Sequence, residues 1–257
     1  MTGTVYRLTG IAIFAVALAC SPPKENQSPA AIAAKGYDLF WADEFDGAVL
    51  DSTKWRHYHP GKRRDAVNVE HAVTLDGQGH LVIATSRSGD DYHTGMIATR
   101  DKFATAFGYF ECRARLQQQV GHWSAFWLQT PTMGKEIGNP AVSGTEIDIF
   151  EYLCNFGDSL VHNLHWDGTD AHHKTVGSGA VVPGLSEGWH SFGLQWSEQE
   201  YVFYVDGRQT WRTDQAVSMR DQFIILSLEV GEWAGDIARA VLPDSLLVDY
   251  VRVYKKR

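Results

Sequence analysis

Short runs of apolar residues, rich in aromatic and β-branched side chains, recur along the chain from residue 80 to its end. Gly, Asp, Asn and Ser cluster between these runs, and no long segment shows the 3.6-residue spacing of an amphipathic helix. The pattern predicts an all-β domain of two stacked antiparallel sheets, a β-sandwich or jelly roll. The expected strands are residues 80–85, 107–116, 122–129, 145–153, 160–166, 190–196, 200–207, 222–230 and 245–254.

Two places in this pattern allow a finer prediction. In the last expected strand, regular alternation would put Asp249 and Val251 on one face and Val248 and Tyr250 on the other. Asp206-Gly207 is a strong signal for a tight two-residue turn. It predicts a hairpin between the strand before it and the QTWRT segment after it.

The first 20 residues resemble a processing signal. Arg7 precedes a mostly apolar stretch, Leu8 to Ala19, which is too short to span a bilayer comfortably and ends at Cys20. Small residues before a cysteine resemble a bacterial lipoprotein cleavage site, with a plain secretory signal as the alternative. Residues 21–36 resemble a flexible tether, and residues 37–257 are expected to form the folded domain. We therefore expect an exported protein, held at the outer membrane or cell surface by a lipid on Cys20, and otherwise periplasmic or secreted.

Composition and charge narrow the possible partners. The chain carries 23 Lys and Arg against 31 Asp and Glu, a net charge of −8, which argues against nucleic acid as a general partner. Its 257 residues can bury a sizeable core in one domain, and we expect a monomer. Beyond Cys20, the two cysteines Cys112 and Cys154 could form a disulfide in an exported protein or remain buried thiols.

The segment from Glu146 to Glu151 is acidic within an otherwise apolar strand, where carboxylates are costly. In a regular strand Glu146 and Asp148 would share a face and Glu151 would point away. A one-residue β-bulge at Ile149-Phe150 would return Glu151 to that face. A row of three carboxylates suits catalysis, while a calcium site or a solvated strand face are the alternatives.

Such a row fits double-displacement glycoside hydrolysis. One carboxylate attacks the anomeric carbon, and a second, about 5–5.5 Å away, protonates the leaving oxygen and later activates water. Asp148 could hydrogen-bond Glu146 and hold it ionised, while negative neighbours would keep Glu151 protonated, as an acid requires.

Ordered motifs extend this pattern over nearly the whole domain, and together they resemble the family 16 glycoside hydrolases, which include laminarinases, agarases, porphyranases and carrageenases. The acidic strand matches the bulged form of the family's catalytic signature. The resemblance implies a jelly roll with a concave cleft and retaining, endo-acting cleavage of a polysaccharide. The matching segments are 41–47 with 50–51 and 54–55, 107–115, 121–128, 146–151, 189–196 with 203–207, and 249–254.

By position, the resemblance implies Glu146 as the nucleophile, Asp148 as its helper and Glu151 as the acid/base, with no cofactor needed for catalysis. Expected substrate-binding residues are Trp123, Trp127, His165, Asn68 and Trp233. His165 should share a face with Asn163, and a structural role is its alternative, as packing is for Trp233. A structural calcium ion is implied at Glu44 and Asp249, with a metal-free structural role as the alternative.

The substrate is less defined than the chemistry. Gly231-Glu232-Trp233-Ala234-Gly235 departs from the usual laminarinase loop, as does the stretch after His165. The basic run 61–65 could bind sulfate or uronate groups at a cleft edge, or simply be solvated. We expect a β-1,3-glucan. The alternatives are a galactan of agar, porphyran, carrageenan or arabinogalactan type, a transglycosylase, and a non-catalytic carbohydrate-binding protein.

Overall fold

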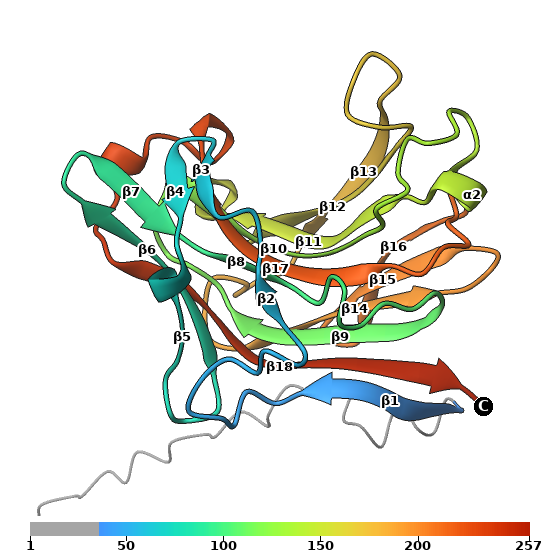
Figure 1. The fold of residues 1–257 in the computed structure, drawn as a ribbon, viewed down its shortest axis with the longest axis horizontal. Coiled ribbons are helices and arrows are strands. Elements are labelled where there is room, and N and C mark those ends of the chain that lie inside the picture. Colours follow the sequence, from blue (N-terminus) through green and yellow to red (C-terminus); the bar gives the residue numbers. More distant parts are fainter. Residues whose placement is uncertain (1–35) are drawn as a thin grey trace, which may run out of the picture.

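The computed structural model describes residues 36–257, so the expected signal segment, Cys20 and almost all of the tether lie outside the described residues. Within the described part, strands dominate and form two sheets that stack face to face (Figure 1). The fold is a β-sandwich of jelly-roll type, which confirms the predicted class.

The larger sheet has eleven strands and includes those at the bottom of Figure 1. Its order is β16-β15-β14-β9-β18-β6-β7-β4-β3, with β1 paired to β18 and β5 to β6. The bounds are β1 (Tyr37–Asp43), β3 (Gly61–Arg63), β4 (Ala66–Asn68), β5 (Val73–Leu75), β6 (Leu81–Ser88), β7 (Asp91–Thr94), β9 (Gly108–Arg115), β14 (His190–Trp196), β15 (Tyr201–Val205), β16 (Arg208–Thr213) and β18 (Asp244–Lys256).

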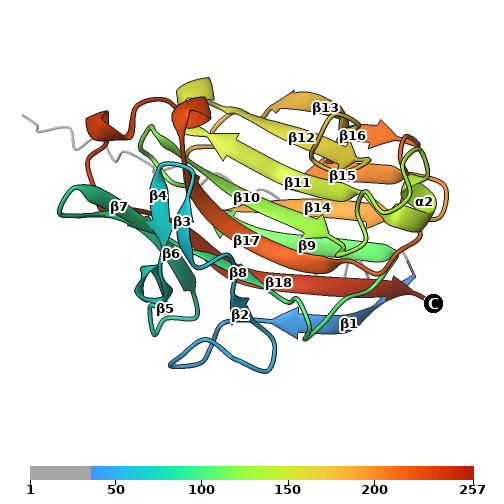
Figure 2. The ribbon, with the colours of Figure 1, turned by 45° about the horizontal axis from the view of Figure 1, so that its top comes forward.

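The smaller sheet has seven strands in the order β13-β12-β11-β10-β17-β8-β2, and Figure 2 looks onto it. Its bounds are β2 (Arg56–His57), β8 (Met96–Ala98), β10 (His122–Gln129), β11 (Glu146–Leu153), β12 (Ser159–Trp166), β13 (Lys174–Val181) and β17 (Phe223–Val230). Among residues 36–257, helical structure is limited to α2 (Pro140–Ser143) and four 3₁₀ turns, η1 (Glu70–Ala72), η2 (Cys154–Phe156), η3 (Glu232–Ala234) and η4 (Ile237–Arg239). No helix among residues 36–257 is long and apolar enough to cross a membrane.

The core lies between the two sheets, and the smaller sheet also buries much of its other face. Along β10, Phe126 and Leu128 point into the main core, while Trp123 and Trp127 belong to separate clusters on the opposite face. All eight residues of β17 are buried. Large side chains therefore pack on the outer face of this sheet as well, and that face is where a ligand site can form.

The Asp206-Gly207 turn is confirmed. Asp206 and Gly207 have φ values of 50° and 74°, which is the left-handed backbone that a two-residue hairpin turn requires. The turn connects β15 to β16, and their pairing begins with Val205 opposite Arg208.

The predicted face assignment in β18 is wrong. The pairing of β18 with β9 shifts between Val248 and Tyr250, so the strand carries a bulge at this point. Val248 and Val251 therefore both pack in the main core, although a regular strand would have placed them on opposite faces. Asp249 lies at the irregularity and forms an ion pair with Arg113.

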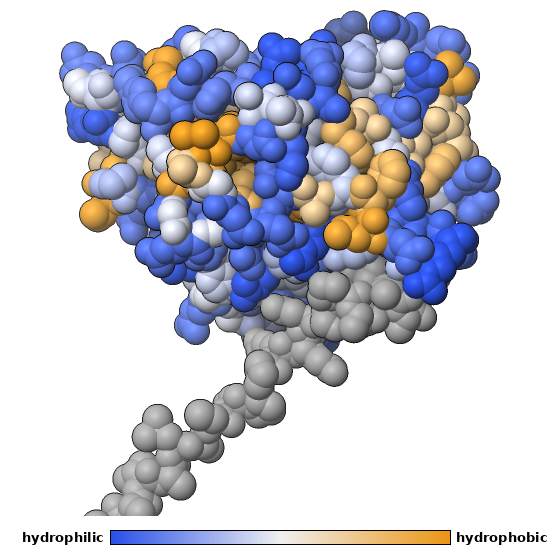
Figure 3. Space-filling model, turned by 60° about the horizontal axis from the view of Figure 1, so that its bottom comes forward, coloured by the Kyte–Doolittle hydropathy of each residue, from blue (hydrophilic) through white to orange (hydrophobic). Residues whose placement is uncertain are grey.

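The two ends of the domain lie side by side on the larger sheet, away from the outer face of the smaller one. Tyr37 pairs with Lys256 in the β1–β18 ladder, and the backbone N–H of Arg257 donates to the carbonyl of Gly36. Figure 3 views this side of the molecule, which is mostly hydrophilic with separate apolar patches. Leu39 and Phe40 of β1 are among the exposed apolar residues.

Candidate active site

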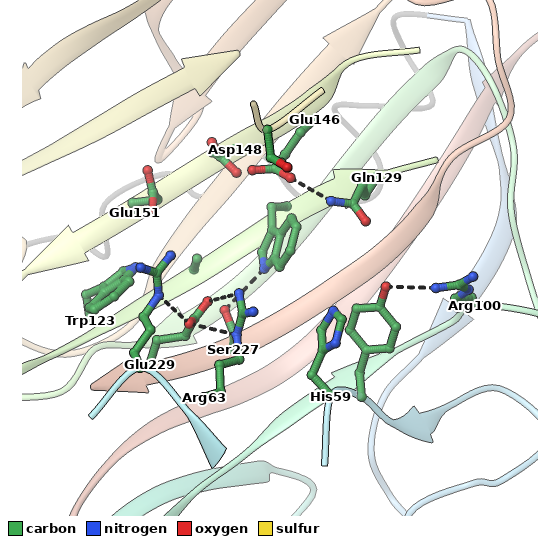
Figure 4. Close-up of a pocket in the computed structure, with 15 residues that line it drawn as sticks. His59, Arg63, Arg100, Trp123, Gln129, Glu146, Asp148, Glu151, Ser227 and Glu229 are labelled. Carbon is green, nitrogen blue, oxygen red and sulfur yellow. Dashed lines mark hydrogen bonds and ion pairs between the residues drawn. The ribbon is translucent and has the colours of Figure 1, made fainter. Parts of the chain in front are cut away.

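A β-bulge in β11 places all three acidic side chains on the outer face of the smaller sheet. The pairing with β12 shifts between Asp148 and Glu151, and both Ile149 and Phe150 pack in the core. Glu151 consequently returns to the face that carries Glu146 and Asp148, as predicted. Figure 4 shows the three carboxylates in a row along the strand.

A buried histidine on β12 supports this bulge. Nδ1 of His162 lies 2.6 Å from the carbonyl oxygen of Ile149, and its Nε2 lies 2.9 Å from Oγ1 of Thr210. Burial lowers the pKa of His162 to about 4, so the ring stays neutral at ordinary pH. A neutral ring that donates from Nδ1 satisfies the carbonyl that the bulge leaves unpaired. His162 points into the core, on the face of β12 opposite to the one that carries Asn163 and His165.

The row of carboxylates opens into a cavity of about 500 Å³ on the outer face of the smaller sheet. Strands β10, β11 and β17 supply its floor, and segments around β2 and β3 supply a wall (Figure 4). The lining residues are Tyr58, His59, Arg63, Arg64, Arg100, Trp123, Ala125, Trp127, Gln129, Glu146, Asp148, Glu151, Thr169, Ser227 and Glu229.

Glu146 sits in a polar environment at one end of the row. Nε2 of Gln129 donates a 2.6 Å hydrogen bond to its carboxylate. An oxygen of Glu146, an oxygen of Asp148 and a ring nitrogen of His165 lie within 4.8 Å of one another. Burial, and then the charge of Glu146, raise the pKa of Asp148 well above its usual value. A protonated Asp148 can donate to its neighbours and stabilise an ionised Glu146.

Glu151 lies at the other end of the row and is also half-buried. Burial, and then the nearby Asp148, raise the pKa of Glu151 to about 8, although Nδ2 of Asn163 donates to its carboxylate at 2.7 Å. The group is therefore protonated at neutral pH. One strand thus presents two half-buried glutamates, of which Glu151 carries a proton at neutral pH, and a proton donor beside a second carboxyl group is what acid–base chemistry requires.

His165 joins the row from β12, where it pairs opposite Glu146 and shares a face with Asn163. Its Nε2 lies 3.3 Å from an oxygen of Asp148, and its Nδ1 lies 2.9 Å from Nε2 of His173. The two imidazole rings stack with an interplanar angle of 14°. The placement supports a role in the site for His165.

The predicted tryptophans occupy different positions. Nε1 of Trp127 donates to Oγ of Ser227 at 3.1 Å, which fixes the indole in the cavity floor. Trp123 is 4% exposed, because the Arg64 guanidinium lies 5.1 Å from its ring and Trp233 packs edge-on against it. Trp233 is 43% exposed beside the cavity.

Asn68 lies outside the cavity lining. Its side-chain amide donates to the carbonyl oxygen of His59 at 3.0 Å, and His59 does line the cavity. This contact supports a cavity wall, and direct substrate contact by Asn68 stays a prediction.

The residues expected to bind calcium are engaged by arginines. Arg252 forms two 2.8 Å hydrogen bonds to the Glu44 carboxylate, and Arg113 pairs with Asp249. Within residues 36–257, the one cluster of three or more potential metal ligands is instead Glu146, Asp148 and His165. Calcium at Glu44 and Asp249 stays a prediction.

The two cysteines of the domain are not joined. Cys112 and Cys154 are both free, the first buried in the core and the second half-buried. Burial raises the pKa of both thiols. Of the two alternatives, a disulfide or buried thiols, Cys112 is a buried thiol.

Comparison with known proteins agrees with this geometry. Residues 60–252 match the model of the family described as Glycosyl hydrolases family 16. The chain belongs to glycosyl hydrolase family 16. The catalytic strand and the cavity of this family 16 member both lie within the matched residues.

Relatives of this family 16 chain differ in the polysaccharide that their names mention. It is 29% identical to a β-glucanase of Rhodothermus marinus, covering 95% of this chain and 93% of that protein. It is also 29% identical to a keratan-sulfate endo-1,4-β-galactosidase of Sphingobacterium multivorum, covering 87% and 56%. The chain spans about half the length of several such curated relatives. A laminarinase catalytic domain from Thermotoga petrophila superposes with a TM-score of 0.72 at 26% identity, covering 86% and 98%.

Sequence reasoning missed several cavity residues of this family 16 chain. Glu229 lies opposite Trp123 in the β10–β17 ladder and is bound by Arg63 and Arg64. The sequence did contain a clue to Glu229, because it is the single carboxylate within the apolar FIILSLEV strand. It lies on the same face of that strand as Ser227. Gln129 was also missed, although it occupies the same face of β10 as Trp127.

Substitution of Gly121 tests how this family 16 cleft is held together. Gly121 has a φ of 85°, and its backbone bonds Ala234 and Gly231 of the Trp233 segment. A Cβ at this position would overlap the backbone of Ile237. We expect Gly121→Ala to lower the free energy of unfolding by about 2–3 kcal/mol or more, measured by denaturant unfolding.

The matched control is Gly188→Ala, at a φ of 75° with open space around its Cβ. It should cost only about 1–2 kcal/mol, the strain of a left-handed backbone. Equal losses in the two variants would show that the Ile237 contact relaxes without cost.

Proposed function

We propose that the protein is a retaining endo-glycoside hydrolase that cleaves internal β-linkages of a polysaccharide. The observation that carries this proposal is the placement of Glu146 and Glu151 on one cleft face, where burial and the nearby Asp148 raise the pKa of Glu151 to about 8. A polar, hydrogen-bonded Glu146 suits nucleophilic attack, while a protonated Glu151 suits proton donation.

The reaction follows from these roles. A carboxylate oxygen of Glu146 attacks the anomeric carbon, and Glu151 transfers its proton to the departing glycosidic oxygen, which releases one part of the chain. The now ionised Glu151 then removes a proton from water, and the resulting oxygen nucleophile displaces Glu146 from the anomeric carbon. Asp148, itself contacted by His165, stabilises the Glu146 carboxylate when it is free.

For the substrate we propose a β-1,3-glucan. The β-glucanase and laminarinase relatives support this choice, and they match the chain over the site. A galactan is the second candidate. It is supported by the galactosidase relative and by the loops after His165 and around Trp233, which depart from the laminarinase pattern.

A polysaccharide panel tests the proposal. The protein is incubated with laminarin, mixed-linkage glucan, agarose, porphyran, carrageenan and arabinogalactan, and the products are resolved by size. We expect a ladder of oligosaccharides from one of them. Transfer products longer than the starting chains would instead indicate a transglycosylase. Binding without any cleavage, by a folded protein, would favour the non-catalytic carbohydrate-binding alternative.

The stereochemistry of the first product provides an independent check. Two displacements at the anomeric carbon restore its configuration, so the freshly released reducing end should be the β-anomer. Proton NMR of early products, before mutarotation, measures this directly. An α-anomer would remove Glu146 from the role of nucleophile.

The pH dependence of kcat/KM should report the ionisation of the proposed acid, Glu151. Because Glu151 must be protonated and its pKa is about 8, kcat/KM should hold below pH 8 and fall about tenfold per unit above it. Initial rates on the preferred polysaccharide from pH 5 to 10 measure this limb. A fall that is complete by pH 6 would contradict the assignment of Glu151.

We also propose export with lipid attachment at Cys20 and a monomeric state. The apolar stretch ending at Cys20 supports the first proposal. Metabolic labelling with a radioactive fatty acid, compared between wild type and Cys20→Ala, tests it. Loss of label in the variant is the expected result.

A further inference from the structure

The cavity wall opposite β11 carries two arginines that share one carboxylate. Glu229 accepts a 2.9 Å hydrogen bond from Nη2 of Arg63 and a 2.8 Å hydrogen bond from Nε of Arg64. The Glu229 side chain is 8% exposed, and Figure 4 shows its carboxylate joined by dashed lines to Arg63. The single carboxylate of Glu229 can neutralise only one of the two guanidinium charges of Arg63 and Arg64.

Arg63 and Arg64 differ in how many of their guanidinium nitrogens remain free to bind a ligand. Arg63 is 28% exposed and engages Glu229 through both Nε and Nη2, so it mainly fixes the carboxylate. Arg64 is 53% exposed and uses only Nε. Among residues 36–257, its two terminal nitrogens have no hydrogen-bond partner. These nitrogens can form the paired N–H donors that match sulfate and carboxylate oxygens.

The backbone at Arg64 points independently to a role for its side chain. Arg64 has a φ of 50° in the turn between β3 and β4. Gly and Asn are the residues that adopt this left-handed backbone conformation most readily, and a long side chain there adds strain. The turn is docked by a 3.2 Å hydrogen bond from the N–H of Asp65 to the carbonyl of Val230. An arginine is therefore held in a fixed place.

That place is within the proposed substrate path. The Arg64 guanidinium covers the ring of Trp123, and Trp123 is two residues along β10 from Ala125, which pairs opposite Glu151. A chain that crosses the carboxylate row towards Trp123 reaches Arg64 within the same cavity. A neutral sugar has no charge to pair with the Arg64 guanidinium.

We propose that Arg64, held by Glu229 with Arg63, forms an anion subsite for a sulfate or carboxylate substituent on the polysaccharide. This inference rests on the proposed function, since it assumes that a sugar chain occupies the cleft. Among the candidates of the proposed function, it favours a galactan or other β-linked chain that bears anionic groups near the cleavage point over an unsubstituted β-1,3-glucan. A sulfated or carboxylated chain should therefore bind better than the same chain without these groups.

Binding to matched ligands tests the subsite without requiring turnover. The full chain carrying Glu146→Gln is titrated with β-1,3-glucan oligosaccharides in neutral, sulfated and carboxymethylated forms. Carrageenan oligosaccharides are compared with their desulfated forms in the same way. Calorimetry at about 50 mM salt yields each Kd, because weak screening at this salt concentration favours detection of a charge contact. The two anionic glucan forms separate sulfate from carboxylate.

We expect an anionic form to bind about tenfold or more tightly than its neutral partner on at least one backbone, since a charge-assisted hydrogen bond is lost in the neutral ligand. Adding Arg64→Asn should reduce this preference to about twofold or less. Asn suits a left-handed backbone, so the variant should fold. The control is Lys62→Gln, whose Nζ lies 3.9 Å from Asp91, and it should keep the preference.

Two results would overturn the subsite alone: equal Kd values for neutral and anionic forms on both backbones, or a preference that Arg64→Asn and Lys62→Gln change equally. If a folded protein binds none of these chains, the anion subsite and the proposed polysaccharide function both fail. Binding of neutral chains without a charge preference would leave the proposed function standing. The outcomes thus separate the two proposals.

Discussion

Glu146→Gln is expected to lower kcat on the preferred polysaccharide by at least about 10³-fold. The amide cannot form the covalent bond to the anomeric carbon, so the two-step route is lost. Glutamine keeps the size of the side chain and can still accept the hydrogen bond from Gln129, so the fold should persist. Initial rates, together with circular dichroism and a melting curve, measure both effects.

The matched control is Glu232→Gln, an exposed carboxylate in η3 near the cleft. It should change kcat little, because it lies outside the cavity lining. Unfolding of the Glu146 variant would instead favour a structural or metal-binding role for the acidic row. A fully active Glu146 variant would show that Glu146 is not the nucleophile.

Glu151→Gln is expected to lower kcat by about 10²–10⁴-fold, the usual contribution of a general acid–base group. Since Glu151 is protonated in the folded protein at neutral pH, a neutral glutamine replaces it without a new buried charge. Asn163 can still donate to the glutamine oxygen. Stability should therefore change much less than activity, as a denaturation curve would show.

The leaving group distinguishes an acid from a merely structural residue. A synthetic aryl glycoside with a good leaving group needs little protonation, so its first step should survive in the Glu151 variant as a burst of released phenol. The polysaccharide, whose leaving group is a sugar hydroxyl, should show the full loss. An equal loss on both substrates would indicate that Glu151 only shapes the site.

The acidic row could be predicted from the sequence because its pattern is local. Period-two alternation fixes the face of Glu146 and Asp148, and the odd spacing to Glu151 requires a bulge if all three are to act together. The bulge in β18 had no such signal. Val248 and Val251 are both ordinary core residues, and nothing in their spacing shows where a partner strand shifts register.

Other features depend on contacts between distant segments. The pairing of Arg64 with Glu229 joins positions 165 residues apart, so neither shows its partner in the sequence. Strand β13 escaped prediction for a different reason. Its KTVGSGAV sequence has two glycines and few apolar residues, because it forms an edge of the smaller sheet and is largely exposed.

The adjacency of Tyr37 and Lys256 decides how the enzyme can be displayed. Both ends of the described chain leave from the larger sheet, while the cavity opens on the outer face of the smaller one. A bead, a fusion partner or a surface joined at either end would meet the back of the sandwich. A long polymer could then still thread across the carboxylate row, and a short linker between the two ends would yield a circular chain with the cleft unobstructed.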